Sequence, residues 1–192
     1  MEWREQLGDD ELVVKVAELL VATSDASDPS IDQAVPEVLR LLRERMRMDV
    51  VFVSEFTDGQ RVFRAVDQAP GAGVIEQGGA DPLEATWCQR VVDGRLPELI
   101  PDSAPFQASG QAPATQFPIG TYISTAIVLA SGEVYGTLCC FSYGVNPAIT
   151  EQDVKKLRYT AQLTAQKIER SRRLIAGMAL APIADKGFTR AR

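Results

Sequence analysis

Apolar residues recur at helical spacing in three segments of the chain. The first segment covers residues 10–22, and the second covers residues 30–46, where Pro36 either kinks the helix or marks its first turn. The third covers residues 151–175 and follows Thr150, a residue type that caps helices. The pattern therefore predicts two helices at the start of the chain and a long helix near its end.

Four other segments are rich in β-branched and aromatic residues, which favours β-strands. They cover residues 49–56, 61–67, 122–129 and 134–142. Asp58-Gly59 joins the first two as a hairpin turn, and alternation in the second places Val62, Arg64 and Val66 on one face. The last two segments are apolar on both faces, so we expect a sheet that is covered on both sides.

One short helix is predicted between the two pairs of strands. Asp81, Pro82 and Glu84 have the order of an N-cap, a first-turn proline and an acidic third residue. Asp93-Gly94 has the composition of a helix end. We therefore expect the helix to begin at Asp81.

Residues 101–118 contain four prolines and show no apolar periodicity. A structureless stretch of this length inside a compact domain is usually functional or disordered. We expect it to act as a lid over a pocket, with Phe106 and Phe117 as apolar anchors against the sheet.

These elements divide the chain into three parts. Residues 1–29 form a helix and a linker, residues 30–175 form one domain that includes the long C-terminal helix, and residues 176–192 form a frayed tail. A length of 192 residues suits one domain with helical extensions.

The chain has no histidine, and this absence restricts its chemistry strongly. It excludes Ser-His-Asp and Cys-His catalytic sites, zinc sites built on histidine, and haem held by a proximal histidine. Three cysteines are too few for a four-cysteine zinc site. We therefore expect no metal and no conventional catalytic residue.

Charge and composition also exclude several partners and compartments. A net charge of −6 argues against a nucleic-acid surface, and the basic residues between 155 and 173 are interpreted as a solvated helix face. Residues 1–11 do not have the pattern of a signal peptide, and no apolar run is long enough to span a membrane. An odd number of cysteines without metal-site spacing suits a reducing compartment. We expect a cytoplasmic protein that binds neither nucleic acid nor membrane.

The two late strands and the following helix resemble the signature of the GAF domain family. In that family a G-x-Y motif leads into one strand, a G-x-L motif lies in the next, and T-x-x-D opens a long helix. Here the motifs read Gly120-Thr121-Tyr122, Gly136-Thr137-Leu138 and Thr150-Glu151-Gln152-Asp153. The segments 48–54 and 86–92 are also similar to the family, and the ordered match covers residues 30 to 172.

The resemblance implies an α+β fold of the GAF type, which is related to PAS domains. Its centre would be an antiparallel sheet of about six strands. The terminal helices would cover one face, and the other face would hold a ligand pocket roofed by short helices and loops.

The resemblance also implies a function, which is a regulatory domain that senses a small molecule in signal transduction and is not an enzyme. Two alternatives stay open: a ligand-free dimerisation or interaction module, and a cysteine-dependent methionine sulfoxide reductase. In the bilin-binding branches a cysteine lies beside a histidine, whereas here Cys88 is followed by Gln89. Haem and bilin are therefore not expected, and no cofactor or ligand is identified.

Eight residues are predicted to line the pocket. They come from the short helix, the irregular segment and the two late strands: Trp87, Cys88, Arg90, Phe106, Tyr122, Ser124, Thr137 and Cys139. Period-two alternation places Tyr122 with Ser124, and Thr137 with Cys139. Each residue taken alone fits an ordinary core equally well.

Cys88 has two interpretations. A redox nucleophile would need an exposed thiolate with a resolving partner in reach, whereas a buried thiol beside Trp87 would only pack. We favour the second interpretation. The side chains of Cys139 and Cys140 leave opposite faces of their strand, so only one of them can face the pocket.

The predicted helices at 10–22, 30–46 and 151–175 have more apolar face than one side of a six-stranded sheet needs. We therefore expect a homodimer through the terminal helices, with the helix at 10–22 contributing most. A signalling output partner is also expected, because GAF domains usually act upstream of kinases, cyclases or phosphodiesterases.

Overall fold

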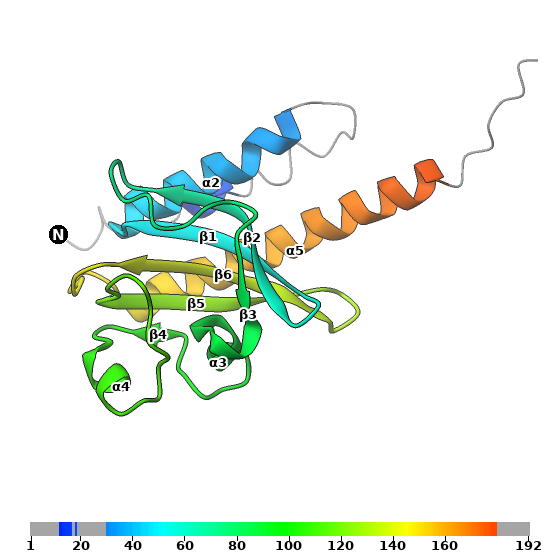
Figure 1. Ribbon diagram of the computed structural model, residues 1–192. Helices are drawn as coiled ribbons and strands as arrows, with labels where there is room; N and C mark the ends of the chain where they lie inside the picture. Colours follow the sequence, from blue (N-terminus) through cyan, green and yellow to red (C-terminus); the bar gives the residue numbers. More distant parts are fainter. Residues whose placement is uncertain (1–11, 17, 19–29, 180–192) are drawn as a thin grey trace, which may run out of the picture.

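A computed structural model describes residues 12–16, 18 and 30–179 of the chain. Its centre is a six-stranded antiparallel sheet with the strand order β3-β2-β1-β6-β5-β4 (Figure 1). The strands are β1 (Val50–Thr57), β2 (Gln60–Gln68), β3 (Ala80–Pro82), β4 (Leu99–Ile100), β5 (Thr121–Val128) and β6 (Val134–Ser142). The expected antiparallel sheet of about six strands is therefore confirmed.

The helices cover both faces of this sheet. They are α2 (Ser30–Met46), α3 (Trp87–Val92), α4 (Ala104–Ala108) and α5 (Glu151–Ala179), with a 3₁₀ turn at Leu83–Ala85. Figure 1 shows α2 and α5 on one face, and α3 and α4 on the other. This is the α+β arrangement that the sequence predicts.

Two apolar cores result, one on each face. Leu42 of α2 and Leu157 of α5 pack with Leu138 and Cys140 of β6 in the first core. Residues of α3 and the following loops pack in the second core with Phe52, Tyr122 and Phe141, among others. Neighbouring residues of β6 thus belong to different cores, which explains why this strand is apolar on both faces.

The predicted ends of the helices agree with the structure to different degrees. The helix α2 begins and ends as predicted and contains Pro36. The helix α5 continues to Ala179 and does not end at residue 175. Residues 12–16 and 18 are helical, as expected for the N-terminal helix, and Leu12 and Val16 pack in the first core. The rest of that predicted helix, and the tail from residue 180, lie outside the described residues.

The prediction that a helix begins at Asp81 is wrong. Asp81 lies in β3, opposite Arg61 of β2, and the two side chains form an ion pair. The helix α3 begins after Thr86, whose hydroxyl oxygen accepts a hydrogen bond from the amide of Gln89 at 3.2 Å. The ion pair and the strand pairing outweigh the local capping pattern at Asp81.

The predicted alternation of the second strand is also wrong. The register between β1 and β2 shifts between Val53 and Ser54, as in a β-bulge. As a result Val66 packs in the second core with Phe63, whereas Arg64 pairs with Glu55. The shift leaves Arg61 on the same face as Phe63, beneath α3.

Residues 101–118 are not structureless, because they contain α4. The amide of Ser103 donates to the carbonyl of Gly120 at 2.8 Å, which ties the segment to the start of β5. From α3, the Trp87 indole donates to Pro113 at 2.8 Å and Arg90 donates to Gln111 at 2.6 Å. The segment is thus held over the sheet at several points, while its action as a lid stays a prediction.

Within residues 12–16, 18 and 30–179, no helix has the length and apolar character needed to cross a membrane.

Candidate functional site

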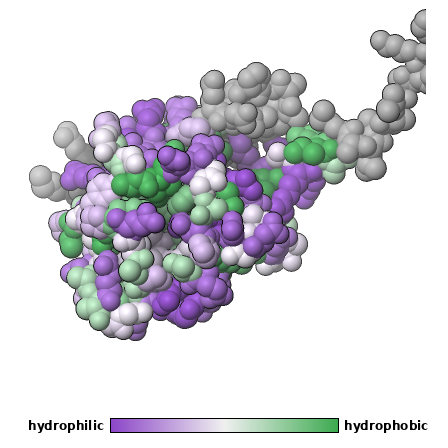
Figure 2. Space-filling view, viewed as in Figure 1, coloured by the Kyte–Doolittle hydropathy of each residue, from purple (hydrophilic) through white to green (hydrophobic). Residues whose placement is uncertain are grey.

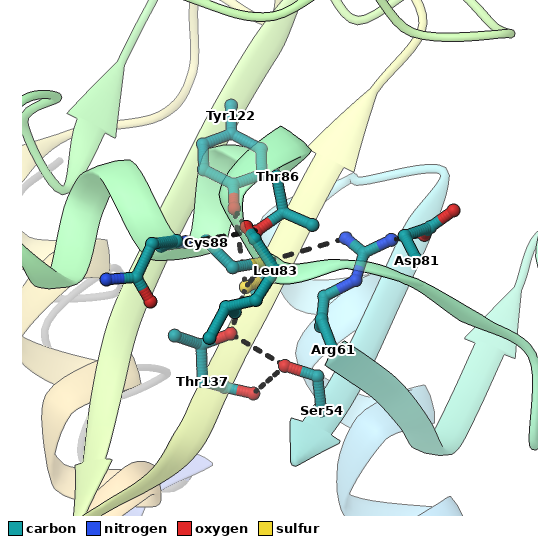
Figure 3. A network of polar contacts seen from close by, with 10 residues as sticks. Ser54, Arg61, Asp81, Leu83, Thr86, Cys88, Tyr122 and Thr137 are labelled. Atoms are coloured by element: carbon teal, nitrogen blue, oxygen red, sulfur yellow. Dashed lines mark hydrogen bonds and ion pairs between the residues drawn. The ribbon is translucent and has the colours of Figure 1, made fainter. Parts of the chain in front are cut away.

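Seven polar side chains meet on the sheet face that α3 covers. Figure 3 shows Ser54, Arg61, Cys88, Tyr122 and Thr137 among them. The seven come from β1, β2, α3, β5 and β6, and we call them the Cys88 cluster: Ser54, Arg61, Cys88, Tyr122, Ser124, Thr137 and Cys139. Strand register explains the gathering, because Thr137 lies opposite Ser54 of β1 and Cys139 lies opposite Ser124 of β5. Three adjacent strands thus present short polar side chains to the underside of α3.

The thiol of Cys88 lies at the centre of this cluster. Its Sγ is 3.4 Å from the Tyr122 hydroxyl, 3.5 Å from Cys139 Sγ and 3.6 Å from Nη1 of Arg61. The side chain of Cys88 is completely buried. A second thiol, a phenol and a guanidinium therefore surround one sulfur atom that is closed to solvent.

Hydroxyl groups surround the second thiol. The Sγ of Cys139 is 2.9 Å from the Ser124 hydroxyl and 3.1 Å from that of Thr137, and the Thr137 hydroxyl is 2.9 Å from that of Ser54. These contacts satisfy the buried hydroxyls. The network therefore holds Cys139 in place from three strands.

Arg61 brings a positive charge into the cluster from its edge. Its guanidinium pairs with Asp81 and lies over the Phe63 ring, 4.1 Å from the ring centroid. Only 13% of the Arg61 side chain is exposed, and its Nε is buried without a hydrogen-bond partner. A cation that is desolvated to this degree stabilises a negative charge next to it.

The pKa values follow from this arrangement. Burial alone would raise the pKa of Cys88, but the hydrogen bond from Cys139 and the charge of Arg61 lower it well below its usual value. Burial, together with the negative charge on Cys88, raises the pKa values of Cys139 and Tyr122 well above the usual ones. The arrangement therefore favours a thiolate at Cys88 beside a neutral thiol and a neutral phenol.

The structure brings together five of the eight residues predicted to line the pocket. These are Cys88, Tyr122, Ser124, Thr137 and Cys139. Trp87 contacts the group through an edge-to-face arrangement with Tyr122, at a centroid distance of 5.2 Å. Arg90 binds Gln111 instead, and Phe106 packs into the second core from α4.

Sequence reasoning missed Ser54, Arg61 and Asp81. One signal for Arg61 was its spacing from Phe63, since residues two apart in a strand share a face. A charged residue on an apolar face is costly to bury unless it pairs with an opposite charge. Asp81 could not be recognised as that partner, because it matches a helix cap in sequence.

A shallow apolar groove lies at the border of the segment 101–118. Its volume is about 300 Å³, and its lining residues are Gly71, Ala72, Val74, Phe117, Pro118 and Tyr143. The ring of Phe117 stacks on Phe141 at a centroid distance of 5.2 Å, and Phe141 lies opposite Tyr122 in the sheet. The groove and the Cys88 cluster are thus connected through two aromatic residues.

No metal centre is evident in the part of the chain that the structure describes, where no three histidine, cysteine or acidic side chains gather in a way that could hold an ion. All three cysteines are free thiols.

Comparison with known proteins gives one family and several structures. A family model described as a GAF domain matches residues 28–169. The sequence has no significant match among curated proteins.

Three solved structures are similar in fold, at sequence identities that show the fold alone. The GAF domain of an Acinetobacter phosphoenolpyruvate-protein phosphotransferase has a TM-score of 0.65 and 13% identity, over 93% of this chain and 98% of that one. Free methionine-R-sulfoxide reductase from Neisseria meningitidis, in complex with its substrate, has a TM-score of 0.66 and 14% identity, over 86% of this chain and 91% of that one. The GAF domain of a putative sensor histidine kinase from Pseudomonas syringae pv. tomato has a TM-score of 0.62 and 17% identity, over 93% of this chain and 96% of that one.

Proposed function

Because the chain belongs to the GAF domain family, a sensor and regulatory fold of signalling proteins, we propose that it senses a small molecule. The proposed site is the sheet face that α3 and residues 101–118 cover. The observation behind this proposal is the groove of about 300 Å³ that borders this segment, where Phe117 links it to the core beneath α3. The groove is shallow and open to solvent, so it would enclose a small molecule only when the segment 101–118 closes over it.

The lining of the groove suggests the class of ligand. Phe117, Pro118 and Val74 present apolar surface, and the Tyr143 hydroxyl already donates to the carbonyl of Ala72 at 2.9 Å. Few polar groups are left to hold a charged molecule. The groove therefore suits a flat, mostly apolar molecule that packs against aromatic rings.

A ligand in this groove would act on the covering segment and on the sheet together. Phe117 belongs to the segment and stacks on Phe141 of β6, which packs in the second core with Tyr122 and Cys88. A displaced Phe117 ring would therefore change the packing under α3. In this proposal the signal passes from the sheet to α5, which packs on β5 and β6 from the opposite face.

Native mass spectrometry tests the binding proposal with a matched pair of variants. The probe is the low-molecular-mass fraction of a cell extract, incubated with the protein and followed by removal of unbound molecules. Val74→Asp places a charge in the groove at a site that is 39% exposed, and Val128→Asp places the same charge at the far end of β5, where Val128 is 48% exposed. We expect a bound mass on the wild type and on Val128→Asp that is lost on Val74→Asp. Equal binding to all three proteins, or to none, would contradict the proposal.

We propose that the domain has no catalytic activity. The thiols of Cys88 and Cys139 are fully buried, whereas efficient turnover of a sulfoxide requires a thiolate that the substrate reaches without opening of the fold. Turnover of free methionine sulfoxide with a dithiol reductant would refute this and would favour the reductase alternative. The free thiols also support the proposed cytoplasmic location, where thiols stay reduced.

Exposed apolar residues near the end of α5 favour a second function, which is dimerisation. Leu174 is 39% exposed and Ile175 is 65% exposed, although both are large aliphatic residues. Figure 2 shows hydrophobic surface at this end of the helix, which projects beyond the sheet in Figure 1. We propose that a second copy of the chain covers these residues, with an output partner as a further candidate.

A further inference from the structure

Two buried thiols from different elements face each other beneath α3. Cys88 comes from the helix and Cys139 from the central strand β6, and their sulfur atoms are 3.5 Å apart. A disulfide needs an S–S distance of about 2.05 Å, so a movement of roughly 1.5 Å would join them. The third thiol is excluded, because Cys140 lies in the other core and contacts Met46.

The surroundings divide the two thiols into different chemical roles. Cys88 faces the Arg61 guanidinium at 3.6 Å, whereas Cys139 faces the neutral hydroxyls of Ser124 and Thr137. The pKa of Cys88 lies well below its usual value and that of Cys139 well above. Cys88 is thus suited to attack an oxidant. Once Cys88 is oxidised, its charge no longer raises the pKa of Cys139, so Cys139 loses its proton more easily and can attack as the resolving thiol.

We propose that Cys88 and Cys139 form a reversible redox switch that hydroperoxides oxidise. The Cys88 thiolate attacks the peroxide oxygen, the O–O bond breaks, and Cys88 becomes a sulfenic acid while hydroxide or alkoxide leaves. The Cys139 sulfur then attacks the sulfenic sulfur, and its proton leaves with the hydroxyl group as water. Two thiols lose two electrons in total, the peroxide gains them, and a small dithiol reverses the reaction.

Burial determines how the oxidant reaches the site. Neither sulfur is exposed, so the α3 segment must open before a peroxide can enter. The short length of α3, six residues, fits local opening without loss of the sheet. We therefore expect oxidation to be slower than for an exposed thiol of similar pKa.

Disulfide formation would also change the charge balance under α3. It removes the negative charge at Cys88, so Arg61 keeps its pair with Asp81 and its contact with the Phe63 ring but loses a second anionic partner. The Arg61 Nε already lacks a hydrogen-bond partner, and a buried cation with fewer partners is costly. The oxidised domain is therefore expected to loosen where β3 and α3 contact β2.

The test treats the full chain with hydrogen peroxide and maps disulfides by proteolysis without reductant. We expect a Cys88–Cys139 linked peptide, a mass loss of two hydrogen atoms, and full reversal by dithiothreitol. Hydrogen exchange of residues 80–92 should be faster in the oxidised protein than in the reduced protein. A link that involves Cys140, oxidation that stops at unlinked acids, or unchanged exchange would overturn the proposal.

Variants separate the roles of the residues. Cys139→Ser should leave a Cys88 sulfenic acid that dimedone traps, and Cys140→Ala should form the disulfide as the wild type does. Arg61→Met should slow disulfide formation at neutral pH by about tenfold or more, whereas Arg61→Lys, which keeps the charge, should slow it less. Thermal melts establish that each variant is folded, and the peptide map of the wild type decides the case even if a variant does not fold. Equal rates for Arg61→Met and wild type would refute the role of the guanidinium.

Discussion

Replacement of Gly136 by alanine should strongly destabilise the domain, because the centre of the sheet has no room for a methyl group. A Cβ at this position would lie 2.0 Å from the carbonyl oxygen of Ser54 and 2.9 Å from the Cα of Glu55. Both are backbone atoms of β1, so no side chain can rotate away. Ordinary contact begins at 3.4 Å, so β1 and β6 must separate locally by roughly 1.4 Å.

The expected cost follows from this displacement. Overpacking of a well-packed core costs about 1–3 kcal/mol, and loss of a ladder hydrogen bond beside it adds about 1 kcal/mol. We therefore expect Gly136→Ala to lower the free energy of unfolding by about 3 kcal/mol. For a chain of this size each kcal/mol corresponds to about 2–4 °C, so Tm should fall by roughly 10 °C.

Urea unfolding followed by circular dichroism measures this cost. Gly73→Ala is the control, because a Cβ there meets nothing within 4 Å, and its free energy of unfolding should stay within about 0.5 kcal/mol of the wild type. A Gly136→Ala variant as stable as this control would refute the close approach of the two strands.

Three further changes test other parts of the account. The lowered pKa of Cys88 means that its thiolate adds stability above the unfolded-state pKa of about 8.5, and that this is lost as pH falls through the folded-state pKa. The stability advantage of the wild type over Cys88→Ala should therefore shrink from pH 8.5 toward acid in urea titrations; a constant difference would show a neutral thiol. Asp153→Ala removes the acceptor for the amide and hydroxyl of Thr150 at the start of α5 and should cost about 1–2 kcal/mol in thermal unfolding, while no loss would exclude this cap. Ile175→Glu should convert the proposed dimer into a monomer in light scattering, and an unchanged mass would show that the end of α5 takes no part.

Local patterns predicted most of the fold. Helical periodicity located α2, and the β-branched runs located β1, β5 and β6, because each signal lies within one element. Thr150 and Asp153 predicted the start of α5 because a cap is also a local structure. The signature glycine Gly136 has a physical reason as well, which is the close approach of a neighbouring strand.

The site was only partly predictable, because it depends on register between distant segments. Alternation identified Tyr122 with Ser124 and Thr137 with Cys139, but it could not show that Cys88 would lie over them. The bulge at Arg64, which the register skips, determines which residues of β2 face α3, and no residue in the sequence marks it. Arg61 therefore became visible as a partner of Cys88 only in three dimensions.

Hydrogen exchange of residues 101–118 is the most direct test of the central claim, that this segment covers a small-molecule site. Exchange is measured for the wild type alone, for the wild type with the low-molecular-mass fraction of a cell extract, and for Val74→Asp with the same fraction. We predict slower exchange of the segment and of the start of β5 in the wild type with the fraction, and no such change in Val74→Asp. Exchange that is the same with and without the fraction in the wild type would contradict the account.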